Sequence, residues 1–167
     1  MAEPIETSQL IPRPVSDSAS EYFEIALPND ANHLGNMLGG RVMHLVDLAG
    51  ALAAARHSRC VVVTASVDSM TFLHPIHIGQ LVLLKSAVNR VFRTSMEVGV
   101  KVYVEDLRTG IRRHTSSAYL TFVALGSNNE RIPVAPVIPE TEEEKRRYDS
   151  ALVRREYRLS QKKHEKP

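Results

Sequence analysis

The most regular pattern of the chain lies at residues 95–105, where apolar and polar side chains alternate without interruption. The apolar members of this pattern are Met96, Val98, Val100, Val102 and Val104. A period of two residues predicts a β-strand with one buried face. Residues 61–73, 80–91 and 111–125 are also rich in strand-forming side chains. The last two of these flank residues 95–105 through short turns, which predicts antiparallel neighbours.

A different pattern covers residues 42–57, which are apolar around almost the whole circumference of a predicted helix. A helix of this kind is usually wrapped by other structure. Asp47 lies in the middle of the run, although an ionised carboxylate is rarely buried without a partner or a function. Gly39 and Gly40 precede the run, and free backbone N–H groups at the start of a helix bind anions and polarised carbonyl oxygens. This combination favours a site that holds a carbonyl compound.

The remaining segments complete an α+β fold. Residues 21–27 form a predicted first strand, and Thr141 with Glu144 forms a capping box for a charged helix at residues 142–160. We expect one antiparallel sheet wrapped around one long central helix, with an extra C-terminal helix. The outer face and the edges of such a sheet need partners, which predicts a homo-oligomer.

These patterns divide the chain into three parts. Residues 1–20 contain prolines, acids and serines and predict a flexible N-terminal arm. Residues 21–126 form the predicted folded domain. Residues 127–167 are expected to form a linker and a basic C-terminal helix.

The composition narrows the class of protein. Hydrophobic residues make up 43% of the chain and charged residues 24%, which is ordinary for a soluble globular protein. A formal net charge of +2 is too small by itself to indicate nucleic-acid binding. The single cysteine, Cys60, excludes an internal disulfide framework and favours a reducing compartment. The longest apolar stretch, residues 45–55, is interrupted by Asp47 and too short to span a bilayer. We therefore expect a cytoplasmic protein without a membrane-inserted segment.

Several segments, in this order, resemble a known family. They are residues 30–40 (DANHLGNMLGG), 43–50 (MHLVDLAG), 63–68 (VTASVD), 72–76 (FLHPI) and 92–96 (FRTSM). The chain is similar in these segments to the hotdog-fold acyl-CoA thioesterases. The similarity is greatest to the cytosolic acyl-CoA hydrolases, a group that includes brain acyl-CoA hydrolase, and it covers residues 22–125.

The resemblance implies a hotdog fold, with subunits paired into dimers and dimers assembled into a trimer of dimers. It also implies hydrolysis of fatty acyl-CoA to a free fatty acid and CoA at the dimer interface. The implied catalytic pair is Asn32 of one subunit and Asp47 of the other, with Thr64 in the same site. The family needs no cofactor, so acyl-CoA is the expected binding partner, and neither nucleic acid nor a membrane is expected.

The chemistry of thioester hydrolysis fits these residue types. Asp47 would activate a water molecule as a general base or attack the carbonyl directly, and Asn32 would orient the water or donate to the thioester oxygen. The N–H groups of Gly39 and Gly40 would form an oxyanion hole. The turn residues would contact the CoA phosphates; they are Arg93, Thr94 and Ser95.

Other interpretations of the same residues remain open at this point. Asp47 could be a structural acid paired with Arg41 or His44 on its own helix, and Thr64 could be an ordinary strand residue. His44 could be the base of a hotdog hydratase or dehydratase. A non-catalytic regulator that binds DNA through the basic tail is a further alternative, but no helix-turn-helix precedes residue 21. A metal site is not expected, because His44 and Asp47 supply too few ligands.

Overall fold

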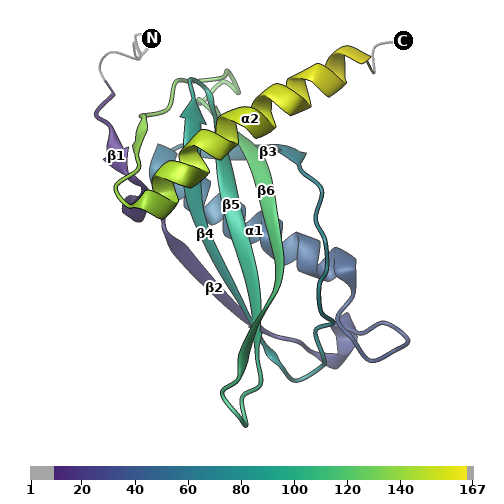
Figure 1. The fold of residues 1–167 in the computed structure, drawn as a ribbon. Coiled ribbons are helices and arrows are strands. Elements are labelled where there is room, and N and C mark those ends of the chain that lie inside the picture. The colour runs from purple at the N-terminus through teal and green to yellow at the C-terminus, as the bar shows by residue number, and fades with distance from the viewer. Residues whose placement is uncertain (1–9, 165–167) are drawn as a thin grey trace.

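The computed structural model describes residues 10–164, and its main feature is a five-stranded antiparallel sheet that curls around a long helix (Figure 1). The sheet order is β2-β4-β5-β6-β3. The strands are β2 (Ser20–Ile25), β3 (Val61–Val67), β4 (Leu81–Phe92), β5 (Ser95–Glu105) and β6 (Arg112–Leu125). The α+β architecture predicted from the sequence, including its C-terminal helix, is confirmed. In the part of the chain that the structure describes, neither helix is long and apolar enough to cross a membrane.

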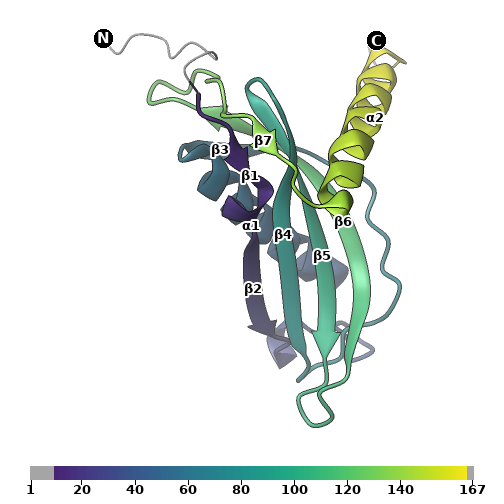
Figure 2. The ribbon, with the colours of Figure 1, turned by 60° about the vertical axis from the view of Figure 1, so that its left-hand side comes forward.

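Helix α1 (Gly39–Ser58) packs on the concave face of the sheet and supplies much of the core (Figure 2). Its buried positions recur at the three- and four-residue spacing of one helical face. They are Val42, Leu45, Val46, Ala49, Gly50, Ala53, Ala54 and His57. The apolar residues of the other face, Met43, Leu48 and Leu52, are each more than 40% exposed in the single chain. The sequence predicted an enclosed helix, whereas one subunit alone covers only one of its two apolar faces.

The close approach of α1 to the sheet depends on Gly50. A Cβ atom added there would lie 3.0 Å from the ring of Phe122, which is fully buried on β6. A contact of this length is tighter than most real Cβ contacts, so a larger residue at position 50 would require the Phe122 ring or the helix to shift. Gly50 therefore permits the close packing of α1 on β6.

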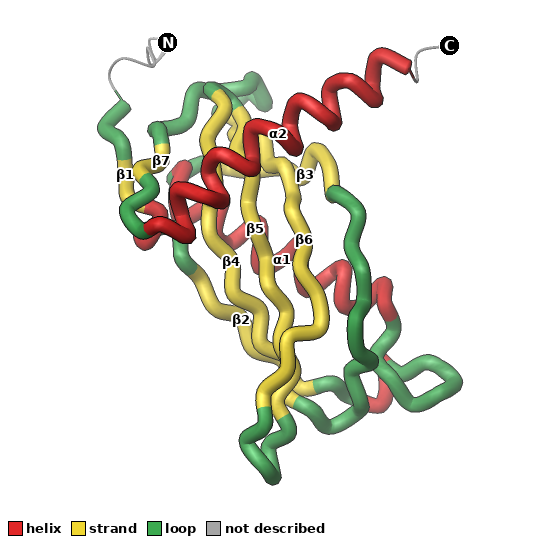
Figure 3. Tube along the Cα trace, viewed as in Figure 1, coloured by secondary structure: helices red, strands yellow, loops and turns green. Residues whose placement is uncertain are grey.

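Strand β5 confirms the alternation seen in the sequence, because its predicted inward side chains are all 3% exposed or less. Its neighbours β4 and β6 pair with it along most of their length. Strand β3 differs from the prediction, because it ends at Val67 rather than continuing to residue 73. Residues 68–80 instead run beside β6 toward the other end of the molecule and form an irregular connection to β4 (Figure 3).

The predicted flexible arm at residues 1–20 is wrong for the part that the structure describes. Strand β1 (Arg13–Pro14) pairs in parallel with β7 (Val137–Ile138), and a 3-10 helix (Val15–Asp17) follows it. Val15 is buried, which explains why this segment packs on the body of the domain. Residues 1–9 lie outside the described residues, so the prediction for them is not tested.

Helix α2 (Glu142–His164) crosses the face of the sheet opposite α1, near one end of the strands (Figures 1 and 3). The predicted capping box is present: the Thr141 hydroxyl accepts from the Glu144 N–H at 3.2 Å, and the Glu144 carboxylate accepts from the Thr141 N–H at 2.9 Å. Two further contacts hold the helix on β4. The Arg90 guanidinium lies 4.0 Å from the centre of the Tyr148 ring and donates to the Tyr148 carbonyl at 3.2 Å.

His57, near the end of α1, is a fully buried titratable group. Its Nε2 lies 2.8 Å from the carbonyl oxygen of Ala135, whereas Nδ1 has no hydrogen-bond partner among residues 10–164. The Arg13 guanidinium donates to the His57 carbonyl at 2.7 Å, which adds a positive charge nearby. Burial is the main cause that lowers the pKa of the His57 side chain below its usual value.

This lowered pKa predicts a loss of stability in mild acid. The unfolded chain takes up the proton first, so the stabilisation present above a pH of about 6.5 is lost as the pH falls through the folded-state pKa of His57. Each unit of difference between the unfolded-state and folded-state pKa adds about 1.4 kcal/mol to the total loss of stability. Urea unfolding at fixed protein concentration between pH 8 and pH 5, roughly, measures it. We expect His57→Gln to flatten the dependence and His114→Gln, at an exposed histidine, to leave it in place. An unchanged slope in His57→Gln would contradict the prediction.

Candidate active site

The centre of the candidate site is a hydrogen bond between α1 and β3. The hydroxyl of Thr64 donates to Oδ1 of Asp47 at 2.6 Å. Asp47 is half-buried on α1, and Thr64 is exposed on β3. A β-bulge at Ala65, next to Thr64, interrupts the pairing of β3 with β6, and bulges of this kind re-aim neighbouring side chains. No hydrogen bond within residues 10–164 uses Oδ2 of Asp47, so one carboxylate oxygen is oriented and the other is free to react.

Strand β3 is the last strand of the sheet, so its outer edge carries unpaired backbone groups. Exposed apolar side chains accompany this edge, among them Val61, Val63 and Val67. The exposed face of α1 adds further apolar area beside the edge. The Asp47–Thr64 pair therefore lies on a surface with the composition of an interface.

Asn32 is held in a loop that precedes α1. Its side-chain Oδ1 accepts from the N–H of Leu34 at 2.9 Å and from the N–H of Asn36 at 3.1 Å. Its backbone N–H donates to the Asn36 carbonyl at 2.7 Å, and Gly35 turns the loop with a φ of 74°. Two donors to Oδ1 fix the orientation of the amide. Its Nδ2 group makes no hydrogen bond within the described chain, so it remains available as a donor.

The structure connects this loop to His77, which the sequence interpretation missed. Nδ1 of His77 lies 2.7 Å from Oδ1 of Asn36, and the two residues also form a β-bridge. Met37 is buried, and its N–H donates to the Ile76 carbonyl at 2.8 Å. The connection between β3 and β4 thus supports the loop that carries Asn32. A polar residue in this irregular connection gives no periodic signal in the sequence.

The first turn of α1 has free donors, as predicted. The earliest backbone N–H groups with acceptors in this turn are those of Arg41 and Val42, both to the Leu38 carbonyl. The N–H groups of Gly39 and Gly40 have no acceptor within the described residues. Nothing lies within 4 Å of a Cβ placed on Gly40, so a ligand can approach its backbone closely.

The turn from Phe92 to Ser95 contributes to a different site, a cavity of about 530 Å³ between this turn, β3, β6 and α2. We call it the arginine pocket. Its lining residues are Ala65, Ser66, Phe92, Arg93, Thr94, Ser95, Thr121, Val123, Arg131, Arg155, Arg158 and Leu159. Ala65 and Ser66, which line the pocket, directly follow Thr64 on the edge strand β3.

The charged side chains that line the arginine pocket are all positive. Among the described residues, four arginines and no acidic residue line it. Arg93, Arg131 and Arg155 form no ion pair among the residues that the structure describes. Guanidinium groups without partners bind phosphate oxygens through paired N–H donors. The sequence interpretation included Arg93, Thr94 and Ser95 but missed Arg131, because nothing in its local sequence distinguishes it from a solvated loop residue.

The structural interpretation of Asp47 as a partner of Arg41 or His44 is wrong. Arg41 forms ion pairs with Glu24 and Asp30. His44 is exposed and makes no hydrogen bond or ion pair to Asp47 within residues 10–164. Over the same part of the chain, no group of three histidine, cysteine or acidic side chains is arranged to hold a metal ion.

The chain is similar to known thioester hydrolases. The family model described as "Thioesterase superfamily" matches residues 34–111. An uncharacterised acyl-CoA thioester hydrolase of Bacillus subtilis, YkhA, is 44% identical over 137 residues, which cover 82% of this chain and 80% of that protein. A rat cytosolic acyl coenzyme A thioester hydrolase is 32% identical over 86% of this chain. The chain spans only 38% of the length of the rat protein.

Two solved structures have the same fold. A hexameric acyl-CoA thioesterase, solved in the apo form, superposes with a TM-score of 0.87 at 41% identity, covering 90% of this chain and 97% of that one. An acyl-CoA hydrolase from Staphylococcus aureus, solved with butyryl-CoA, CoA and CoA disulfide, superposes with a TM-score of 0.86 at 34% identity. It covers 92% of this chain and 94% of its own.

The hydrogen bonds of Asn32 predict how its loop responds to substitution. Asn32→Ala removes the acceptor for the N–H groups of Leu34 and Asn36, so these amides should exchange with deuterium about tenfold faster, as expected for one lost hydrogen bond. Asn32→Asp keeps an acceptor oxygen in the same position and should retain the protection. Hydrogen exchange followed by NMR measures both variants. Equal protection in the wild type and Asn32→Ala would show that the side chain does not hold the loop.

Proposed function

The chain belongs to the thioesterase superfamily and is an acyl-CoA thioester hydrolase with the hotdog fold, and from this premise we propose that it hydrolyses fatty acyl-CoA to a free fatty acid and CoA at a site built around Asp47. The observation that carries the proposal is the hydrogen bond from Thr64 to Asp47. It places an oriented carboxylate beside an exposed residue of the edge strand β3, where a substrate can reach it.

In the proposed mechanism, Asp47 supplies the attack on the thioester carbonyl. Thr64 engages Oδ1, which leaves Oδ2 to remove a proton from water or to attack the carbonyl carbon itself. Both routes use the carboxylate oxygen that Thr64 does not engage. The tetrahedral intermediate then expels the CoA thiolate as its leaving group. When water attacks, the fatty acid forms directly and the proton held by Asp47 passes to the thiolate. When Asp47 attacks, an anhydride between Asp47 and the acyl group remains, and water hydrolyses it to the fatty acid and the free carboxylate.

The donors of the site would stabilise the oxyanion. The N–H groups of Gly39 and Gly40 are free and can point at a developing negative charge at the start of α1. The Asn32 amide adds a side-chain donor, because its oxygen is engaged by the loop and only Nδ2 remains. We therefore propose that Asn32 donates a hydrogen bond rather than accepting one.

We propose that Asn32 and Asp47 of one site belong to different subunits. No hydrogen bond joins the two residues within the described chain. Asp47 lies about 12 Å along the helix axis from Gly39, whereas the loop of Asn32 precedes the helix. Pairing of two β3 edges would satisfy the unpaired backbone and cover the exposed faces of α1. The hexameric relative supports a trimer of such dimers.

Alanine variants of the Staphylococcus aureus hydrolase support the assignment of the three residues. They replace one Asn, one Asp and one Thr, and the separations of these positions along that chain equal those between Asn32, Asp47 and Thr64. The same residue types at the same spacing in a protein with this fold favour the same roles.

We place the phosphate end of CoA in the arginine pocket, where Arg93, Thr94 and Ser95 meet the arginines of α2 and the Arg131 loop. Because β3 is an edge strand and carries both Thr64 and two pocket residues, Ala65 and Ser66, we propose that one extended molecule passes around this edge to reach the pocket and Asp47. Water is the only co-substrate of this reaction, so we propose that no metal or other cofactor takes part. A cytoplasmic location agrees with the name of the rat relative and with the single cysteine.

The proposal predicts release of free thiol from acyl-CoA. A thiol-reagent assay over a series of acyl chain lengths should detect turnover and define the preferred chain. Asp47→Asn and Asn32→Asp should each lower kcat by about 10²- to 10⁴-fold, because one removes the base and the other the amide donor. Asp149→Asn, at an exposed carboxylate on α2, is the matched control and should behave as the wild type. No thiol release at any chain length, or full activity in Asp47→Asn, would overturn the proposal.

A shared site also predicts complementation between inactive variants. A dimer of one Asp47→Asn chain and one Asn32→Asp chain has one intact site, so a random co-expressed mixture should recover about a quarter of the wild-type activity. The two chains can carry different affinity tags, which allows the mixed oligomer to be purified and quantified. An inactive mixed oligomer would contradict the shared site while leaving the role of Asp47 to the previous test.

A further inference from the structure

Glu97 is a buried carboxylate that the proposed chemistry does not use. It lies on β5 among the positions expected to face solvent, yet its side chain is 0% exposed. A bulge in β4 leaves Asn89 out of the strand pairing, and Nδ2 of Asn89 donates to Oε1 of Glu97 at 3.1 Å. A Cβ on Gly99 would lie 2.9 Å from this amide, so the position of Asn89 requires a glycine there. The sheet is thus shaped around the Glu97 carboxylate.

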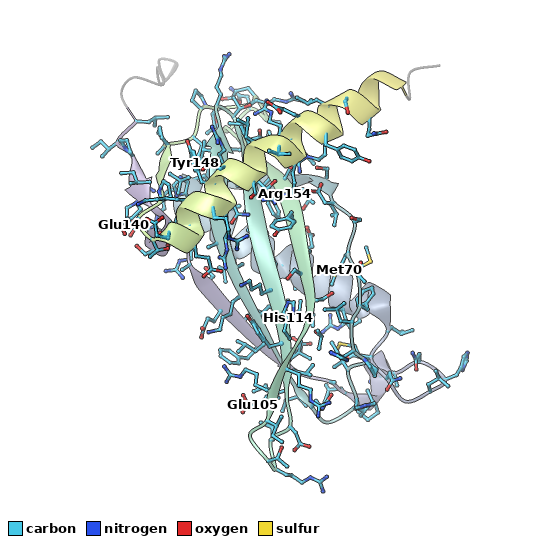
Figure 4. All side chains as sticks on the ribbon, viewed as in Figure 1. Met70, Glu105, His114, Glu140, Tyr148 and Arg154 are labelled. Carbon is cyan, nitrogen blue, oxygen red and sulfur yellow. The ribbon has the colours of Figure 1, made fainter. Side chains whose placement is uncertain are left out.

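Two arginines of α2 converge on Glu97. Nε of Arg154 lies 3.2 Å from each carboxylate oxygen, and its Nη2 donates to Oε1 at 2.7 Å. The same guanidinium lies 3.7 Å from the centre of the Tyr119 ring, and Figure 4 shows Arg154 between α2 and the sheet. Nη1 of Arg158 donates to Oε2 of Glu97 at 3.3 Å and to Oδ2 of Asp68 at 2.8 Å. Two carboxylates therefore balance two guanidinium groups beneath the helix.

These contacts fix the orientation of α2 at the arginine pocket. Arg154 and Arg158 are one helical turn apart, so their attachment to Glu97 sets the rotation of the helix about its axis. Arg155 then faces the pocket, with its guanidinium 4.3 Å from the centre of the Phe92 ring. Both ion-pair contacts of Arg158 use Nη1, so its Nε and Nη2 have no acceptor within the described residues, and Arg158 also lines the pocket.

The energetics of these ion pairs indicate that they orient α2 on the sheet rather than simply attach it. Moving a carboxylate and a guanidinium out of water is costly, and an apolar contact often attaches two elements equally well. A forked guanidinium–carboxylate contact adds a specific orientation instead. That orientation matters here, because Arg155, next to the contact, lines the pocket and forms no ion pair within the described residues.

We infer that Glu97 is a positioning residue, which acts through Arg154 and Arg158 to hold Arg155 and Arg158 in place for the phosphorylated nucleotide end of the substrate. The identity of that ligand rests on the proposed function. The positioning role predicts an effect that depends on the phosphates of the substrate rather than on its thioester.

The test compares Glu97→Gln with Glu105→Gln, because Glu105 lies on the same strand and also pairs with an arginine, Arg112, away from the pocket. Glu97→Gln should raise KM for an acyl-CoA about tenfold with little change in kcat. With an acyl-pantetheine thioester of the same chain length, which lacks the nucleotide, the two variants and the wild type should have equal kcat/KM. Titration calorimetry with adenosine 3′,5′-bisphosphate should show binding about tenfold weaker in Glu97→Gln than in Glu105→Gln.

The outcomes separate this inference from the proposed function. Weaker bisphosphate binding in Glu97→Gln supports the positioning role even if no thioester is cleaved, in which case the proposed function fails alone. The positioning role is overturned if Glu97→Gln and Glu105→Gln bind the bisphosphate equally well. It is also overturned if Glu97→Gln loses as much kcat/KM on the pantetheine thioester as on acyl-CoA. A wild type that cleaves acyl-CoA without binding the bisphosphate overturns it as well. If Glu97→Gln does not fold by circular dichroism, Asp68→Asn gives the same test, since it removes the charge of the other carboxylate that pairs with Arg158. It should weaken bisphosphate binding to a smaller extent, and unchanged binding in it counts against the inference.

Discussion

The packing of α1 against the concave face of the sheet is the constraint on which the rest of the structure depends. The helix is apolar on two faces, but the sheet covers only one of them. Gly50 permits α1 to lie close to Phe122, and Asp47, one turn earlier on the same helix, lies within hydrogen-bond distance of Thr64. The second apolar face is left beside the unpaired edge of β3. The same geometry that builds the core therefore leaves an exposed apolar surface of the kind found at protein interfaces.

The site draws on elements that each contribute a different kind of group. Helix α1 supplies a carboxylate and free N–H groups, β3 supplies a hydroxyl, and the loop before α1 supplies an amide donor whose oxygen is already engaged. Helix α2 lies on the opposite face of the sheet and contributes only at the arginine pocket. Its ion pairs with Glu97 connect the outer layer of the fold to the end of the site where phosphates are expected.

Much of the fold could be predicted because its elements obey simple periods. The alternation at residues 95–105 identified β5 and its buried face, and the capping box at Thr141 identified the start of α2. The failures lie where long-range contacts override local pattern. The β-branched run after Val61 continues past the end of β3, and the proline-containing segment before Ser20 packs through Val15 and pairs with β7. Neither outcome is encoded in nearby residues.

The sequence by itself determined the element order, the buried face of β5 and the presence of an acid in an apolar helix, because these depend on the period and type of side chains along the chain. It also identified Asp47 and Thr64 as candidates, although only the folded chain brings them to 2.6 Å. Tertiary structure alone decided that Glu97 is buried. Strand alternation assigns it to the solvent face, but a bulge at Asn89, the absence of a side chain at Gly99 and two arginines of a distant helix convert that face into a charged interior. Such convergence has no local signature, because its members are brought together only by packing.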